Sequence, residues 1–270
     1  MAVHFDVSRK LPIALSIAGS DSGGGAGVQA DLKTLAALSV HGTCALTCIT
    51  AQNPKRVWAI QACSPRLVRA QIEAVWSELR PTAIKTGMLY SAAIIEEVAH
   101  ALRSKRDVPL VVDPVMVATS GARLLKPNAI AALVTKLLPL ARLVTPNLQE
   151  AEALVGANLS TVEDLRRAAK QLHEQFGCAA LVKGGHLTGL REAVDVLYDG
   201  ADEFVLTAPF VRGRHTHGTG CTYSAAVTAY LSRGCLLPEA VTQAKEYITQ
   251  AIVRSQRIGK HWSLNFGCRN

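Results

Sequence analysis

Aromatic residues are scarce in this chain, at 5% of 270 residues, although hydrophobic residues as a whole make up 49%. Small aliphatic side chains must therefore fill most of the core, which is typical of a parallel sheet covered by helices. The formal net charge is +8, but there is no long Lys/Arg run and no basic stretch interleaved with aromatic residues. These absences argue against nucleic-acid binding, and they leave the positive charge to serve a nucleotide or simple solubility.

Long apolar runs and paired cysteines are also missing. No run approaches the roughly 20 apolar residues of a membrane span, and the N-terminus lacks the apolar segment of a signal peptide. The seven cysteines form no C-x-x-C pair and have no zinc-finger spacing. We therefore expect reduced core thiols, no membrane partner and a cytoplasmic location.

Short apolar runs alternate with helical periodicity along the whole chain. Strands are expected at residues 12–18, 43–50, 82–86, 110–112, 143–145 and 179–183, and helices at 25–39, 65–79, 91–103, 148–155, 161–176, 218–232 and 238–258. Asp199-Gly200 lies between two further short runs and predicts a hairpin. This alternation predicts an α/β fold, with a mostly parallel sheet between two helical layers and an antiparallel edge hairpin. No linker interrupts it, so one domain is expected over residues 1–270, with its core at about 12–258.

Ligands of such folds bind beyond the carboxyl ends of the strands, where the sequence places two glycine-rich loops. The first, at 18–27, contains a G-x-G-x-x-A match at Gly25, Gly27 and Ala30. The acid that a dinucleotide site needs about 20 residues later is missing, and so is a Gly-Lys-Ser or Gly-Lys-Thr phosphate loop. Two acids of this region, Asp21 and Asp31, instead favour polar contacts with a neutral or cationic small molecule.

The second loop, at 216–222, leads directly into an apolar helical run. Gly218 and Gly220 would let backbone amides approach an anion, and the helix N-terminus adds a partial positive charge. A phosphoryl group in flight would be stabilised there, and the structural alternative is a plain turn and N-cap. The helix dipole favours the thiolate of Cys221 in the first turn. Three duties are open to this thiol: general base, hydrogen-bond partner of a substrate hydroxyl, or packing.

Further polar residues follow other strands. Asp113 ends a buried strand, and Asn147 and Glu150 lie three apart at the start of a helix. Such oxygens suit a hydrated Mg²⁺, although Glu150 also fits a capping box. Lys183 ends another strand, where it would either neutralise nucleotide phosphates or lie unpaired on the surface.

Together, seven segments resemble the bacterial hydroxymethylpyrimidine/phosphomethylpyrimidine kinases of the ribokinase-like superfamily. They are residues 18–31, Ala51-Gln52-Asn53, Lys85-Thr86-Gly87-Met88, Asp113-Pro114-Val115-Met116, Thr145-Pro146-Asn147, Lys183-Gly184-Gly185-His186 and residues 216–222. Any one of them is a weak signal, whereas seven in the same order are highly specific. The resemblance covers roughly residues 12 to 258 and implies a ribokinase-like three-layer α/β/α sandwich.

The resemblance implies two successive ATP-dependent phosphorylations in thiamin biosynthesis, first of 4-amino-5-hydroxymethyl-2-methylpyrimidine and then of its monophosphate. It implies that Gln52 pairs with the amino group and ring nitrogen of the pyrimidine, because an amide offers both a donor and an acceptor. The implied pocket residues are Ala26, Asp31, Thr50, Met88 and Val115, and the implied anion hole is Gly218, Thr219 and Gly220, with Cys221 beside the reacting hydroxyl. Asp113 and Glu150, with Asn147, would organise Mg²⁺, and Lys183, Asn147 and Thr219 would bind ATP. The implied partners are the small-molecule pyrimidine and ATP, and the superfamily also offers a homodimer.

Three places depart from the commonest family pattern: Ala122-Arg123 near the lid glycine, Pro54-Lys55-Arg56 after Gln52-Asn53, and His215. They lie at or near lid and phosphate regions, so the second phosphorylation is the weaker expectation.

A pyridoxal kinase is the alternative activity on the same scaffold. Related pyridoxal-specific members tend to lack the glutamine at position 52, and some carry a lid cysteine that Val117-Ala118-Thr119 does not provide. A non-catalytic ligand sensor is a further alternative, against which the intact segment 218–221 argues.

Overall fold

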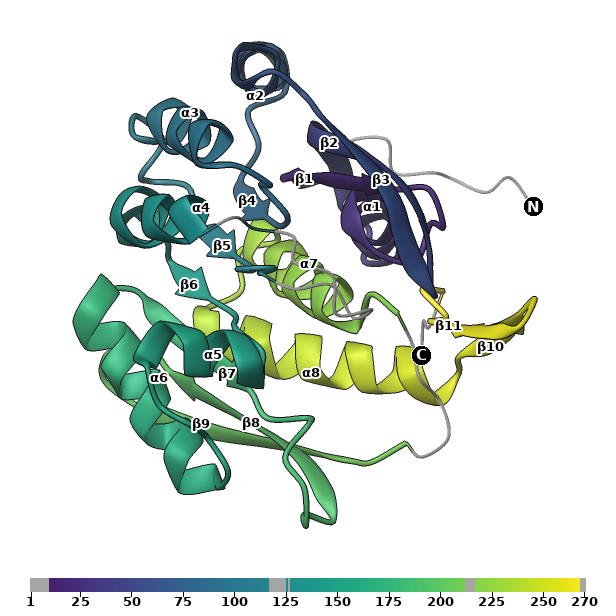
Figure 1. The fold of residues 1–270 in the computed structure, drawn as a ribbon, viewed down its shortest axis with the longest axis vertical. Helices are drawn as coiled ribbons and strands as arrows, with labels where there is room; N and C mark the ends of the chain where they lie inside the picture. Colours follow the sequence, from purple (N-terminus) through teal and green to yellow (C-terminus); the bar gives the residue numbers. More distant parts are fainter. Residues whose placement is uncertain (1–9, 117–124, 126, 212–216, 268–270) are drawn as a thin grey trace, which may run out of the picture.

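The computed structural model describes residues 10–116, 125, 127–211 and 217–267. Within them a nine-stranded sheet runs in the order β3-β2-β1-β4-β5-β6-β7-β8-β9 (Figure 1). Six neighbouring strands are parallel, in the order β2, β1, β4, β5, β6 and β7. Strands β3, β8 and β9 pair antiparallel with their neighbours. Their bounds are β1 (Ile13–Asp21), β2 (His41–Asn53), β3 (Arg56–Ala62), β4 (Ala83–Thr86), β5 (Leu110–Val112), β6 (Leu143–Val144), β7 (Ala179–Lys183), β8 (Glu192–Tyr198) and β9 (Glu203–Pro209). The expected mostly parallel sheet with an antiparallel edge hairpin is confirmed.

Helices cover both faces of this sheet (Figure 1). One layer holds α2 (Pro65–Leu79), α3 (Ala92–Leu102), α4 (Pro127–Ala132), α5 (Leu148–Val155) and α6 (Val162–Phe176). The other holds α1 (Gly27–Ala37), α7 (Thr219–Ser232) and α8 (Leu237–Val253). Strand β5 shows the division, because Leu110 and Val112 belong to the core of the first layer and Val111 to that of the second. Successive strand residues point to opposite faces, so this three-residue strand serves both cores.

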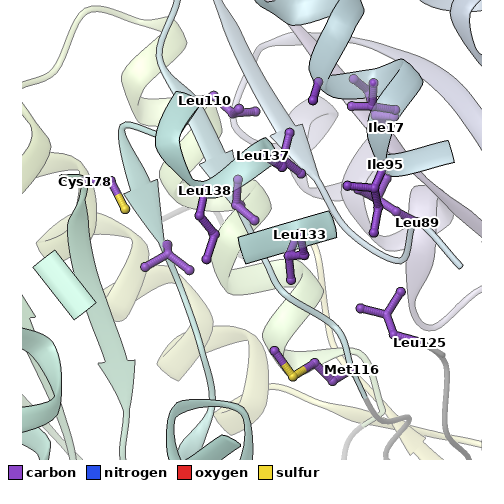
Figure 2. Packing of buried hydrophobic residues seen from close by; sticks show 14 of the residues in the cluster. Ile17, Leu89, Ile95, Leu110, Met116, Leu125, Leu133, Leu137, Leu138 and Cys178 are labelled. Carbon is purple, nitrogen blue, oxygen red and sulfur yellow. The ribbon is translucent and has the colours of Figure 1, made fainter. Parts of the chain in front are cut away.

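The first layer contains one helical stretch that the sequence did not predict. Helix α4 continues into a π-helical turn (Leu133–Leu137) and a 3₁₀ turn (Leu138–Leu140). Figure 2 shows Leu133, Leu137 and Leu138 packed with Leu110, Ile95 and Ile17 in the core. This apolar packing holds the stretch against the sheet beneath the loop that carries Met116.

Two boundaries differ from the expectation. The last helix was expected to reach residue 258, but α8 ends at Val253 and is followed by the hairpin of β10 (Gln256–Ile258) and β11 (His261–Ser263). Gly259, at φ 57°, supplies the left-handed turn that the hairpin needs. Strand β3 was not expected at all, although its hairpin has a local cause, since the Asn53 side chain accepts hydrogen bonds from the amides of Lys55 and Arg56.

Among the described residues, no helix is long and apolar enough to cross a membrane. The parallel strands β1, β4, β5, β6 and β7 all deliver their carboxyl ends to one edge of the sheet. The start of α7 lies at that same edge, and the candidate site is built there.

Candidate active site

A cavity of about 560 Å³ opens at the carboxyl edge of the sheet. It brings together almost every residue that the sequence singled out. The lining includes Ala26, Thr50, Gln52, Met88, Val115, Asp113, Asn147, Glu150, Lys183, Gly218, Thr219, Gly220 and Cys221. Segments that are far apart in the chain therefore form one site, whose volume lies in the range of small-molecule pockets.

The start of α7 forms a backbone-lined wall of the cavity. Its N-cap is Gly218, at φ 84°, and a Cβ atom there would lie 1.8 Å from the carbonyl oxygen of Gly25. Only glycine fits this left-handed position and this close approach. Because the N-cap has no side chain to satisfy the first amides, the 14-residue helix presents them and its dipole to the cavity.

Cys221 lies in the first turn, but its surroundings do not favour the thiolate. Burial raises the pKa of Cys221 to about 11, and the charge of Lys85 is the largest influence that opposes this rise. Of the three duties left open by the sequence, burial disfavours the general base, because that duty needs the thiolate. At neutral pH this group is a thiol.

Lys183 and Asp113 meet beneath Gly220. The ammonium of Lys183 lies 3.3 Å from Asp113 Oδ1, and a Cβ atom on Gly220 would lie 3.3 Å from the same ammonium. The side chains of Lys183 and Asp113 are 12% and 4% exposed. Burial opposes the charge of Lys183, but Asp113 and then Glu150 raise its pKa. Lys183 is thus a paired cation at the helix start, not an unpaired surface lysine.

Glu150 accepts hydrogen bonds from two backbone amides, while its burial disfavours the charged carboxylate. Its Oε2 accepts from the Asn147 amide at 2.9 Å, while Asn147 Oδ1 accepts from the Glu150 amide, so the capping box is present. Its Oε1 accepts from the amide of Met116. Burial raises the pKa of Glu150 to about 6; the charge of Lys183 opposes this rise, and the charge of Asp113 adds to it. The cap does not exclude the cation-binding role, because the carboxylate also faces the cavity.

The first glycine-rich loop uses its amides internally. Asp21 Oδ1 accepts from the amide of Gly23, and Oδ2 accepts from those of Gly25 and Ala26. Despite its burial, the hydrogen bonds from His217, Gly23 and Ala26 lower the pKa of Asp21. Asp21 therefore holds its own loop, and this loop has no amide cluster left to cradle a phosphate.

Gln52 reaches the cavity from β2 with its amide held on two sides. Thr50 Oγ1 donates to the Ser20 carbonyl at 2.8 Å and lies 3.1 Å from Gln52 Oε1. On the other side, Gln52 Nε2 lies 3.1 Å from His217 Nε2. The same His217 nitrogen lies 3.2 Å from Asp21 Oδ2. His217 and Asp21 thus orient the amide that faces the ligand.

Asp31 is the one predicted pocket residue that does not line the cavity. It is fully buried on α1, where its carboxylate accepts from Lys85 Nζ at 2.6 Å and from Ser16 Oγ at 2.5 Å. The expected ligand contact is corrected, because Lys85 stands between Asp31 and the cavity. Lys85 had no role in the sequence analysis, although a lysine inside a strand of four buried residues was a usable signal.

A second buried ion pair was also missed. Lys245 of α8 donates to Asp195 Oδ2 of β8 at 2.7 Å, and both residues line the cavity. His261 of β11 lines it too. A lysine in the buried stripe of α8 was the signal. The lid residues Val117, Ala118, Thr119, Ala122 and Arg123, and also His215, lie outside the described residues.

Comparison with known proteins agrees with this geometry. The model of the family described as phosphomethylpyrimidine kinase matches residues 21–265. A hydroxymethylpyrimidine/phosphomethylpyrimidine kinase of Synechococcus elongatus is 47% identical over 250 residues, which cover 93% of this chain and 95% of the relative. The thiamine biosynthesis bifunctional protein ThiED of Geobacter sulfurreducens is 47% identical over 252 residues, 93% of this chain, but the chain spans only 51% of its length.

Solved structures give the same result. The ADP complex of Bacillus subtilis pyridoxal kinase matches with a TM-score of 0.88 and 41% identity over 95% of this chain and 98% of that one. A phosphomethylpyrimidine kinase from Clostridium difficile matches with a TM-score of 0.79 and 42% identity over 89% and 99%. The ribokinase-like three-layer fold expected from the sequence is thereby confirmed. The chain belongs to the phosphomethylpyrimidine kinase family, and it is a kinase.

Proposed function

We propose that this kinase phosphorylates 4-amino-5-hydroxymethyl-2-methylpyrimidine with ATP and then phosphorylates the monophosphate to the diphosphate. One observation carries the proposal: a single cavity holds an oriented glutamine amide, Gln52, and the uncapped start of α7. The amide suits the edge of an aminopyrimidine, and the helix start suits a phosphoryl group. The names of the relatives support the same pair of substrates.

In this proposal the pyrimidine lies between Gln52 and the start of α7. The amide oxygen would accept from the exocyclic amino group, and the amide nitrogen would donate to the adjacent ring nitrogen. Met88, Val115 and Ala26 supply apolar contacts to the ring. The hydroxymethyl group would then point toward Gly220 and Cys221, where the phosphoryl group arrives.

ATP would place its γ-phosphoryl group at the first amides of α7. These amides and Lys183 would stabilise the charge on the phosphoryl oxygens during transfer. Because Asp113 holds Lys183 beneath Gly220, the cation is oriented before substrate binds. Positioning and charge neutralisation, more than acid–base chemistry, would supply the acceleration.

Mg²⁺ fits the carboxylates of the site only with other ligands. Among the described residues no group of three or more His, Cys, Asp or Glu side chains could hold a metal ion. The carboxylates of Asp113 and Glu150 are nevertheless both buried and close to each other. Burial raises the pKa of Glu150 most, and the charge of Asp113 raises it further. A magnesium ion that keeps waters and phosphate oxygens as its main ligands suits this pair, and it would neutralise phosphate charge.

Pyridoxal kinase activity is the second candidate, because a pyridoxal kinase matches this structure with a TM-score of 0.88. Gln52 favours the pyrimidine, since an amide pairs with its amino group and the adjacent ring nitrogen, whereas the carbons beside the ring nitrogen of pyridoxal carry only a methyl group and a hydrogen.

A homodimer is a further proposal. Ile49 on β2 and Trp58 on β3 are 54% and 53% exposed at the edge of the sheet. An exposed apolar pair beside an edge strand suits a second copy of the chain. Sedimentation of the wild type and of Trp58→Glu tests this, and a monomeric wild type would contradict it.

The test of function is a coupled ADP-release assay with Mg-ATP. We expect turnover with the pyrimidine and with its monophosphate, at a higher kcat/KM than with pyridoxal. Equal or better kcat/KM for pyridoxal would overturn the pyrimidine assignment, and no turnover with any of the three would favour a ligand sensor.

A further inference from the structure

Lys85 carries more hydrogen-bond donors than the fold uses. It is the third residue of β4, in register with Ser16 of β1, and its side chain is 1% exposed. Its ammonium donates to Asp31 Oδ1, and the described part of the chain offers it no second acceptor. Because an ammonium group has three N–H donors, two remain for a ligand.

These donors lie at the wall of the cavity. Lys85 lines it together with Gly87 and Cys221, and a Cβ atom on Gly87 would lie 3.4 Å from the ammonium. Helix α7 packs on β4, the strand that carries this lysine. Burial raises the pKa of Cys221, and the charge of Lys85 is the largest influence that lowers it. The ammonium and the thiol therefore lie near each other in the site.

Packing alone does not require this charge. Burying a lysine and an aspartate removes both from water, and hydrophobic residues of similar volume often stabilise such positions equally well. Here Asp31 keeps the lysine charged, since its carboxylate is the largest influence that raises the pKa of Lys85 against the opposing effect of burial. A permanently charged donor with unused N–H groups in a substrate cavity is best explained by a substrate oxygen that it binds.

We propose that Lys85 is a catalytic residue whose ammonium donates a hydrogen bond to the acceptor hydroxyl oxygen of the substrate. The inference rests on the proposed function for the identity of that alcohol. In the step, the hydroxyl oxygen forms a bond to the γ-phosphorus, and the bond from phosphorus to the bridging oxygen breaks, leaving its electron pair on ADP. The hydroxyl proton passes to an oxygen of the transferred group. Lys85 keeps its own protons and steadies the charge of the acceptor oxygen.

The experiment replaces the ion pair as a unit, so that no buried charge is left alone. Lys85→Met combined with Asp31→Asn is compared with the wild type and with Lys105→Met. Lys105 does not line the cavity; it donates to the Ala101 carbonyl and Ser104 and lies over the Trp76 ring. We expect kcat to fall about 100- to 1000-fold in the double variant, as when one oxyanion donor is removed, with wild-type kinetics for Lys105→Met. Thermal unfolding verifies that the double variant is folded.

Equilibrium binding separates ligand contact from a structural role. Calorimetry without ATP compares the pyrimidine alcohol with its 5-methyl analogue, which lacks the hydroxyl oxygen. We expect the wild type to prefer the alcohol by about tenfold, as for a hydrogen bond to a charged group, and the double variant to lose the preference. The proposal would be overturned by a folded double variant that still prefers the alcohol and keeps a kcat within about threefold of the wild type. Removing one oxyanion donor should lower kcat far more than that.

Two further outcomes are distinguishable. If the double variant does not fold, a crystal structure of the wild type with the pyrimidine decides: Lys85 Nζ within about 3.2 Å of the hydroxyl oxygen supports the contact, and a clearly longer separation refutes it. If the wild type ignores the pyrimidine but phosphorylates pyridoxal, the proposed function fails, and the same comparison is made with pyridoxal and its analogue lacking the 5′-hydroxyl.

Discussion

Replacing Gln52 by methionine should change which substrate the enzyme prefers. The two side chains have similar length, but methionine keeps neither the donor nor the acceptor of the amide. Two neutral hydrogen bonds to the pyrimidine edge are lost, each contributing about 0.5–1.5 kcal/mol. A total of about 2 kcal/mol corresponds to a roughly 30-fold fall in kcat/KM for the pyrimidine. Pyridoxal, which does not depend on that pair, should change by less than about threefold.

The assay measures kcat/KM for both alcohols by ADP release at saturating Mg-ATP. Gln61→Met is the matched control, since Gln61 lies exposed on the neighbouring strand β3 and does not line the cavity. Thermal unfolding reports any damage from the lost contacts to Thr50 and His217. A parallel fall for both substrates, or an unchanged pyrimidine value, would refute the recognition role of Gln52.

Three more predictions concern the other end of the cavity. The pKa of Glu150 is raised from 4.5 to about 6 in the folded protein, so between these pH values the folded state binds a proton that the unfolded chain has released. The stability that this proton gives is therefore lost as pH rises through about 6. Mg-ATP should therefore raise Tm more at pH 7.5 than at pH 5.5, and Glu150→Gln should abolish that difference; equal shifts in the wild type would contradict this. With a pKa of about 11, Cys221 should react slowly with iodoacetamide at pH 7 and about tenfold faster per pH unit above it, as followed by peptide mass spectrometry. A rate that levels off near pH 7 would mean an activated thiolate. Gly218→Ala forces a Cβ atom against the Gly25 carbonyl at a left-handed φ, so kcat should fall at least 100-fold and Tm should drop; near-normal activity would disprove the need for that backbone geometry.

The sequence predicted most of the sheet because its buried strands are short apolar runs between helical patterns. It did not predict β3, since that strand is half-exposed and its turn depends on the Asn53 side chain. The last helix was predicted too long because β10 is only three residues long and exposed throughout, so it shows no alternation. Local hydrogen bonds determine such boundaries, and the hydrophobic periodicity of a sequence does not reveal them.

The site was predictable wherever a polar residue follows a buried strand, as Asp113 and Lys183 do. Asp31 was misplaced because a sequence does not reveal that Lys85, on a different strand, takes up its carboxylate. The duty of Cys221 was left open because the helix dipole, which favours the thiolate, is visible in sequence, whereas the burial that raises its pKa is not. Pairing and desolvation are tertiary properties, and these corrections arise from them.

The most direct test of the account is a competition followed by ³¹P NMR. Enzyme, Mg-ATP and equal concentrations of the pyrimidine and pyridoxal are mixed, and phosphorylated products are identified as ATP is consumed. We expect the pyrimidine monophosphate to appear first and its diphosphate to follow, ahead of pyridoxal phosphate. Accumulation of pyridoxal phosphate alone, or ATP that remains intact, would contradict it.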